Sequence, residues 1–378
     1  MNGRGCDSKG IHLAIDAVGA KHSGGAVVLS DIVRAAIRDS EVKRITVFCS
    51  PRRLLQFDFP NSDRLVLAEQ AAADSSTFGR LLWLASGLGR EVLRRNADLL
   101  LCMSGMGWCS TRTALFFQQS LVFCDEALRL CDVRTRLRIR AMARLMKSSS
   151  RLAALVIAQT PTMADLIQRH CNVPRSKIIL AEPWGDTVGM DSRDSGHVAA
   201  MLNAPEGFRL LYVGNTEPYK NVKCIIEGFA IVRRRFPQAG LFLTCSPEHP
   251  FCRNDGVWGL GSLSGSPLRQ AYTLATGFVT ASLSESGNLT LAEALMMGTP
   301  VLTADRGYAR DLCGDCCIYF DPLNPSTLSQ AMIKLLENRQ LREEMAQRGI
   351  LRAATARAMR PYDRMVGRLV AVAGNPAG

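Results

Sequence analysis

The stretch that decides the fold is SESGNLTLAEALMMGTPV, residues 284–301. It follows a short buried-strand pattern, GFVTAS, and passes through a turn of small residues, Ser286 to Asn288, into an apolar helical run. Gly298, with Pro300 beyond it, ends that helix. This order of strand, turn and helix predicts one step of an α/β sheet.

The rest of the chain repeats that step. Strand patterns occur at IHLAIDA, RITVFC, DLLLCMS, ALFFQ, LAALVIA and KIILAE in the first half, and at FRLLYVG, GLFLTC, GFVTAS, PVLTAD and CIYFD in the second. Helical periods separate them, and two closing helices are expected after the last strand. Such alternation predicts parallel sheets with helices on both faces. A chain of 378 residues exceeds one core, so we expect two domains, joined by a linker within 184–207.

Two glutamates flank the small-residue turn. Glu293 lies one turn inside the helix, where it can accept hydrogen bonds from the two hydroxyls of a ribose, and Glu285 can face a sugar from the other side. The first turn of the helix offers unpaired N–H groups and a positive dipole to a diphosphate. We therefore expect the nucleotide sugar to bind at Ser286, Gly287, Asn288 and Leu289. The alternative is that Glu293 is a solvated helix carboxylate.

A second candidate segment is LLYVGNTEPYKNV, residues 210–222. It reads as a strand, a turn at Gly214 and a helix that begins near Lys220. A lysine at that position can meet phosphate oxygens as a point charge. The alternative is an ordinary surface lysine.

Composition indicates a globular protein, with 47% apolar and 21% charged residues. No apolar run approaches the roughly 20 residues of a membrane span, and Asp16 interrupts the first apolar stretch, so we expect a cytoplasmic protein. The thirteen cysteines are mostly scattered, which predicts reduced structural thiols. Cys313 and Cys316 have the spacing of a metal knuckle, but no second pair completes a zinc site.

The net charge is +12, and its excess belongs to the first half: residues 1–190 carry +9 and residues 191–378 carry +3. Much of it lies in a predicted basic, amphipathic helix over 127–152. Such a helix can lie on an anionic membrane surface. The alternative is a core-packed helix with a solvated charged face. No recognised module or aromatic-interleaved basic stripe supports nucleic-acid binding, so no nucleic-acid partner is expected.

The E-x7-E spacing, followed by EALMMGTPVLTADRGYARDLCGDCCIYFDP, resembles the donor-binding region of GT-B glycosyltransferases of the retaining family 4. Sequences of that family are of the type E-(S/G)-F-G-L-x-x-x-E-A-x-x-x-G-x-P-V. The resemblance implies two Rossmann-like domains that face each other across a cleft. We expect an acceptor-side domain at 1–188, a donor-binding domain at 189–356 and a helix at 357–378 that crosses back.

The resemblance also implies roles for further residues. Relatives carry an Arg and a Lys that neutralise the leaving diphosphate; the Lys matches Lys220, whereas the Arg position is Asn215. Gly24 and Gly25 match a glycine loop that approaches donor and acceptor, although a plain turn is the alternative. Further correspondences are the pair Gln118 and Gln119, for which loop-capping amides are the alternative, and His22, which could not be assigned to the histidine that touches the donor sugar in relatives.

The sequence therefore predicts a retaining glycosyltransferase that moves a hexose or deoxyhexose from a nucleotide diphosphate sugar to a glycan or lipid-linked glycan. Lys220, Glu285 and Asn215 are the expected catalytic residues. No Asp-x-Asp tripeptide occurs, so no metal and no other cofactor is expected. The alternatives are a nucleotide-sugar epimerase or hydrolase of the same fold, and a non-catalytic, membrane-associated partner of a glycan assembly complex.

Overall fold

The structure is a computed structural model, and it describes residues 10–19, 23–51, 59–74, 77–185 and 196–374. Seven parallel strands form the first sheet, in the order β3-β2-β1-β4-β5-β6-β7. They are β1 Ile11–Asp16, β2 Val42–Cys49, β3 Leu65–Glu69, β4 Leu99–Cys102, β5 Arg112–Phe116, β6 Leu155–Ala158 and β7 Ile178–Leu180. Strands β4 and β6 are buried along their whole length, which is why continuous apolar runs mark them in the sequence.

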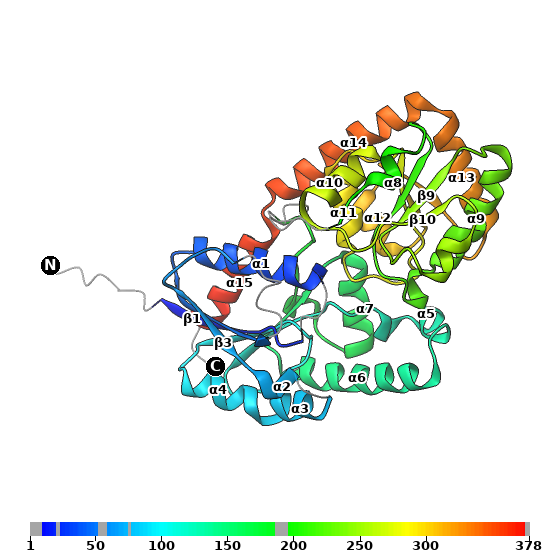
Figure 1. The fold of residues 1–378 in the computed structure, drawn as a ribbon. Coiled ribbons are helices and arrows are strands. Elements are labelled where there is room, and N and C mark those ends of the chain that lie inside the picture. Colours follow the sequence, from blue (N-terminus) through cyan, green and yellow to red (C-terminus); the bar gives the residue numbers. More distant parts are fainter. Residues whose placement is uncertain (1–9, 20–22, 52–58, 75–76, 186–195, 375–378) are drawn as a thin grey trace.

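Helices cover both faces of this sheet (Figure 1). They are α1 Ser23–Arg38, α2 Ala71–Asp74, α3 Thr77–Leu82, the π turn η2 Trp83–Gly87, α4 Leu88–Arg94, η3 Leu121–Phe123, α5 Asp125–Arg129, α6 Val133–Leu152, α7 Pro161–Cys171 and η4 Arg175–Lys177. Apolar side chains of α1 pack on one face, and those of α4, α6 and α7 pack on the other. The sheet is thus the middle layer of a three-layer domain.

Six parallel strands form the second sheet, in the order β10-β9-β8-β11-β12-β13. They are β8 Arg209–Tyr212, β9 Gly240–Leu243, β10 Val257–Gly259, β11 Gly277–Thr280, β12 Val301–Ala304 and β13 Cys317–Phe320. The helical segments are α8 Ala199–Leu202, η5 Pro218–Lys220, α9 Val222–Arg235, η6 Pro250–Arg253, α10 Gly265–Leu274, α11 Leu289–Met296, α12 Gly307–Cys313, α13 Pro325–Glu337, α14 Arg339–Ala358 and α15 Pro361–Gly374. One face packs against α9 and α13, and the other against α10 and α11. The two Rossmann-like, parallel-sheet domains that the sequence predicts are confirmed.

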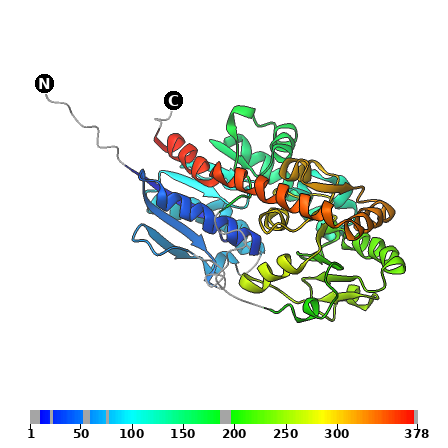
Figure 2. The same ribbon diagram turned by 90° about the horizontal axis from the view of Figure 1, so that it is seen from above.

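The last helix, α15, belongs to the first domain in space (Figure 2). Its buried side chains join the core beneath α1 and β1; they are Tyr362, Met365, Val366 and Leu369. Arg38 of α1 forms a two-pronged ion pair with Asp363, with N–O distances of 2.8 and 3.0 Å. Residues 186–195, where the boundary at 188 is predicted, lie outside the described residues, and the boundary predicted at 356 falls within α14, so both stay predictions.

Two predicted helical segments are wrong. The helix expected over 127–152 is divided, because Asp132 starts a new helix by accepting a hydrogen bond from the Thr135 backbone N–H at 2.9 Å. Three helices follow the last strand instead of two. Asn338 caps α14, and Arg360, with a φ of +47°, ends it before Pro361.

Candidate active site

Both candidate segments lie at the carboxyl edge of the second sheet. The loop with Gly214 follows β8, and the turn at Ser286 to Asn288 follows β11. Strands β8 and β11 are neighbours, and the chain order changes direction between them, since β9 and β10 lie on the other side of β8. Such a switch point is where open α/β sheets bind ligands.

Lys220 and Glu285 form an ion pair between these two loops. Lys220 Nζ donates to Glu285 Oε1 at 2.5 Å, and the two side chains are only 18% and 12% exposed. Burial lowers the pKa of Lys220, but the charge and hydrogen bond of Glu285 raise it by more, so the net pKa lies above its ordinary value. The ammonium is therefore charged at neutral pH, and the surface-lysine alternative does not hold.

Glu293 is buried in the first turns of α11, with 7% of its surface exposed. Its Oε2 accepts a hydrogen bond from the Tyr272 hydroxyl at 2.8 Å. Burial raises the pKa of Glu293 to about 7, and the Tyr272 bond opposes that rise. The alternative of a solvated helix carboxylate is thus wrong. A carboxyl with this pKa changes its charge near neutral pH.

Asn288 caps the amino terminus of α11. Its Oδ1 accepts from the Leu291 backbone N–H at 3.3 Å and from the Thr290 hydroxyl at 3.0 Å. The residue has a φ of +31°, and in the family pattern quoted above a glycine stands at this position. Its Nδ2 is buried and has no hydrogen-bond partner among the described residues. A buried unpaired donor is costly unless a ligand or water accepts its proton.

The turn before α11 touches the first domain. Ser286 Oγ lies 2.9 Å from Gln159 Oε1 and 3.1 Å from the Gln118 carbonyl oxygen, and the Thr160 hydroxyl donates to the Ser286 carbonyl at 3.3 Å. A Cβ at Gly287 would lie 2.7 Å from Gln159 Cβ, so only glycine fits there. The candidate donor turn is therefore enclosed by both domains.

The glycine loop of the first domain also reaches this turn. A Cβ at Gly24 would lie 3.1 Å from Leu289 Cδ1, so the start of α1 faces the start of α11. Gly25 is half-buried in the first turn of α1. His22 lies outside the described residues.

Three remaining predicted residues form hydrogen bonds within or between loops. Asn215 is exposed, and its Oδ1 accepts from the Glu217 backbone N–H at 3.3 Å, so its amide caps a local turn. Gly214 has a φ of +149° and donates its N–H to Thr244 Oγ1 at 2.9 Å. Gln119 Oε1 accepts from the Leu121 N–H at 3.3 Å, which is the loop-capping alternative.

Sequence reasoning missed three residues of this region: Gln159, Thr160 and Tyr272. Gln159 and Thr160 stand where β6 meets α7, directly after the predicted strand LAALVIA, and no role was predicted for them. Their signal was a Gln-Thr-Pro directly after a buried strand. Nothing in the local pattern separates Tyr272 from an ordinary core tyrosine.

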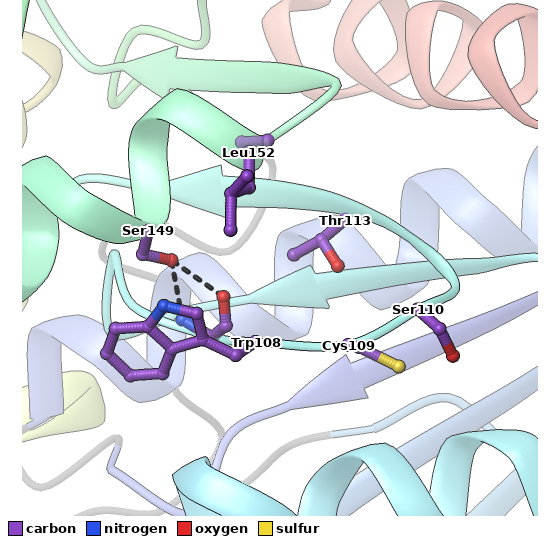
Figure 3. A pocket seen from close by; sticks show the side chains of 8 residues that line it. Trp108, Cys109, Ser110, Thr113, Ser149 and Leu152 are labelled. Carbon is purple, nitrogen blue, oxygen red and sulfur yellow. Dashed lines mark hydrogen bonds between the residues drawn. The ribbon is translucent and has the colours of Figure 1, made fainter.

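Two cavities lie elsewhere. One, of about 300 Å³, lies between the β4–β5 loop and the end of α6, where Ser149 Oγ bonds the N–H and the carbonyl of Gly107 at 3.0 and 2.7 Å (Figure 3). The other, of about 690 Å³, lies beside β7 and α15. Neither is lined by a predicted site residue. Among the described residues, no group of three or more His, Cys, Asp or Glu side chains could hold a metal ion.

Comparison with known proteins finds a family match in the second domain. Residues 207–338, which contain both candidate segments, match the family model described as glycosyl transferases group 1. This match connects the second domain of the chain with the group 1 glycosyltransferases. It is 25% identical over 224 residues to mannosylfructose-phosphate synthase of Agrobacterium fabrum, covering 53% of this chain and 48% of that protein. It is 23% identical over 237 residues to O-antigen chain mannosyltransferase B of Escherichia coli, covering 57% and 60%. The chain thus spans about half to three fifths of these relatives.

Solved structures show that the chain has the GT-B fold. Sucrose-phosphate synthase of Thermosynechococcus elongatus superimposes with a TM-score of 0.74 at 15% identity, over 95% of this chain and 98% of that one. Anabaena HepE in complex with UDP-glucose gives 0.68 at 15% identity, over 96% and 99%. Within the described residues, no helix combines the length and apolar character that crossing a membrane requires.

Proposed function

We propose that the chain transfers a hexosyl or deoxyhexosyl group from a nucleotide diphosphate sugar to a hydroxyl of a glycan or lipid-linked glycan, with retention at the anomeric carbon. The observation that carries this proposal is the arrangement of Lys220, Glu285, Glu293 and the amino terminus of α11 at the sheet switch point. One ammonium, a helix dipole and unpaired N–H groups suit a diphosphate. Two acidic side chains suit the hydroxyl groups at its two ends.

The donor diphosphate would replace Glu285 as the ion-pair partner of Lys220. In the free chain the ammonium is neutralised by the Glu285 carboxylate at 2.5 Å. A diphosphate placed at the start of α11 offers a larger negative charge to the same ammonium. Glu285 is then released toward the sugar. Donor binding therefore gives Lys220 a new ion-pair partner, while the Glu285 carboxylate exchanges its ion pair for hydrogen bonds from the sugar hydroxyls.

The reaction breaks the bond between the anomeric carbon and the diphosphate, and its electron pair leaves with the phosphate oxygen. The acceptor oxygen forms the new bond on the same face, and its proton passes to that leaving oxygen. Lys220 and the N–H groups around Ser286 to Leu289 stabilise the growing negative charge. Asn215 supplies no charge, so Lys220 and the helix dipole carry this task.

Nucleotide binding tests the proposal directly. We expect one of GDP, UDP and dTDP to raise the melting temperature, since a ligand at 100 times its Kd adds roughly 2.7 kcal/mol of stability. Lys220→Met should abolish this shift, whereas Lys223→Met, which changes an exposed lysine three residues away, should keep it. The proposal fails if none of the three nucleotides binds, or if both variants bind as the unchanged chain does.

Acceptor dependence separates transfer from the alternatives. A nucleotide sugar incubated without acceptor should stay intact if the chain is a transferase. An epimerase or hydrolase would convert it, and a non-catalytic partner would leave it intact with every acceptor. Transfer that appears only with a glycan or lipid-linked acceptor is the expected result.

The basic helix α6 supports the proposal that the protein acts at a membrane surface. Its exposed face carries Arg134, Arg138, Arg140, Arg144, Lys147 and Arg151. Three apolar side chains near its start are also exposed, Leu130 at 52%, Val133 at 61% and Leu137 at 62%. Ile139 and Met146 face the core. A surface that combines cations with exposed leucines suits an anionic bilayer, where a lipid-linked acceptor would lie.

Vesicle sedimentation tests this surface. We expect binding to vesicles that contain phosphatidylglycerol, weaker binding at high salt, and about 1 kcal/mol lost for each arginine removed. Arg138→Glu with Leu137→Glu should release the chain. Arg339→Glu, an 85% exposed position in the other domain, is the matched control. Equal binding of the two variants would contradict the assignment.

A further inference from the structure

Two cysteine thiols lie side by side at the carboxyl end of β9. Cys245 follows that strand, Cys252 is part of η6, and their Sγ atoms are 3.8 Å apart. Both cysteines are free and half-buried. The sequence-based prediction treats them as scattered structural thiols, because six residues separate them in the chain.

The backbone already holds these sulfurs close together. The His249 N–H donates to the Ser246 carbonyl at 2.9 Å, and the Cys252 N–H donates to the His249 carbonyl at 2.8 Å. The Cys245 carbonyl accepts from the Gly261 N–H at 2.8 Å. A disulfide bond is about 2.0 Å long, so side-chain rotation has only about 1.8 Å to close.

The segment from Thr244 to Cys252 contacts the candidate donor loop. His249 Nε2 lies 3.2 Å from the Thr216 hydroxyl, and Thr244 Oγ1 accepts from the Gly214 N–H at 2.9 Å. Gly214 and Thr216 follow β8 on the path to Lys220. A covalent change at the cysteine pair therefore acts on the segment that positions this loop.

We propose that Cys245 and Cys252 are a thiol–disulfide site, which a small disulfide such as oxidised glutathione converts to an intramolecular bridge. The Cys252 thiolate attacks the glutathione disulfide and releases one glutathione thiolate. Cys245 then attacks the Cys252 sulfur of the mixed disulfide and releases the second. Two cysteine thiols are oxidised, one glutathione disulfide is reduced, and two protons leave the protein thiols.

The order of attack follows from the surroundings of each sulfur. Burial, and then the charge and bond of the neighbouring Cys252 sulfur, raise the pKa of Cys245 to about 12. Cys245 is thus a poor first nucleophile. Once Cys252 is part of a mixed disulfide it carries no charge, so that contribution to the Cys245 pKa disappears and the second step becomes easier.

Peptide mass spectrometry tests the bridge on the full chain. Trypsin should release residues 236–253 as one peptide that contains Cys245 and Cys252 and no other cysteine. After treatment with oxidised glutathione and alkylation of free thiols, we expect this peptide to be unalkylated and two hydrogens lighter. The peptide with the half-buried Cys124 should remain alkylated or carry glutathione, and reductant should reverse the change. Alkylation of both cysteines, or a glutathione adduct that persists on Cys252, would overturn the proposal.

The consequence for nucleotide binding rests on the proposed function. We expect the nucleotide diphosphate Kd to change several-fold on oxidation and to return on reduction, and not to change in a Cys252→Ser variant. If the bridge forms and the Kd stays the same, the link to the donor loop is wrong while the thiol–disulfide site stands. If no nucleotide binds in either state, the proposed function fails and the mass measurement still decides the bridge.

Discussion

Replacing the buried Glu293 by glutamine is predicted to stabilise the protein at alkaline pH. Glutamine has nearly the same shape, and its oxygen can still accept the hydrogen bond that Tyr272 donates at 2.8 Å. Unlike the carboxylate, it is neutral at every pH. The substitution therefore removes the cost of burying a charge and keeps the packing of α11.

The magnitude follows from the raised pKa. Burial raises the pKa of Glu293 from its ordinary 4.5 to about 7, so the folded chain holds a proton that the unfolded chain has released. The stabilising contribution of this proton is complete below about pH 4.5 and is lost as the pH rises through about 7. Above that pH the carboxylate costs roughly 3 kcal/mol, an order-of-magnitude value from the linkage relation. Glu293→Gln does not bear this cost.

Urea unfolding at about pH 5 and about pH 8 measures the effect. We expect the free energy of unfolding of Glu293→Gln to exceed that of the unchanged chain by a margin that grows toward roughly 3 kcal/mol at the higher pH. The same variant should bind the nucleotide diphosphate more weakly, because an amide offers one acceptor oxygen to a ribose in place of two. Glu227→Gln, at a half-exposed position on α9, should show no such pH dependence.

The opposite result is informative. If the stability difference between Glu293→Gln and the unchanged chain is the same at both pH values, Glu293 does not titrate near neutrality. If the variant is less stable at the higher pH, the carboxylate is stabilised in the fold. Either outcome would refute the reasoning from burial.

Three further expectations follow from contacts already described. Gly287→Ala should reduce nucleotide binding and transfer about tenfold or more, because the alanine Cβ would lie 2.7 Å from Gln159 Cβ. Adding Gln159→Gly to this variant should restore part of the binding and transfer. A double variant with no recovery would contradict the predicted clash. Asp132→Ala should lower the free energy of unfolding by about 1 kcal/mol through loss of the α6 cap, with Asp165→Ala on the exposed side of α7 as a comparison in urea unfolding. EDTA should leave the transfer rate unchanged, since Lys220 and a helix dipole serve the diphosphate; a rate that falls with EDTA and returns with Mg²⁺ would refute metal independence.

Much of the fold could be predicted because the inner strands are buried on both faces. Runs such as LLLC at 99–102 and LVIA at 155–158 are apolar throughout, and each is a strand. The strand at 65–69 was missed, since it lies at the sheet edge and is mostly half-exposed, so its pattern is weak. The long basic helix was wrongly predicted as continuous, because the apolar spacing runs on through Asp132 while the cap depends on one side-chain bond.

The site was predicted unevenly for a similar reason. Glu285, Glu293 and Lys220 stand in local patterns of strand, turn and helix, and the structure brings Glu285 and Lys220 together. Gln159 contributes from the other domain, and no local pattern tells which residue after β6 will meet Ser286. Contacts across domains depend on how two folded units approach each other, and sequence periodicity carries no information on that approach.

The crossing of α15 onto the first sheet has a consequence for biosynthesis. Tyr362, Met365 and Leu369 cover apolar surface of a sheet whose last strand ends at Leu180. At elongation rates of 5–20 residues per second, roughly 10 to 40 s pass between the emergence of that strand and of its cover. The apolar surface that α15 covers in the folded protein therefore stays exposed on the nascent first domain until the second domain has been translated. During that time chaperones can bind it.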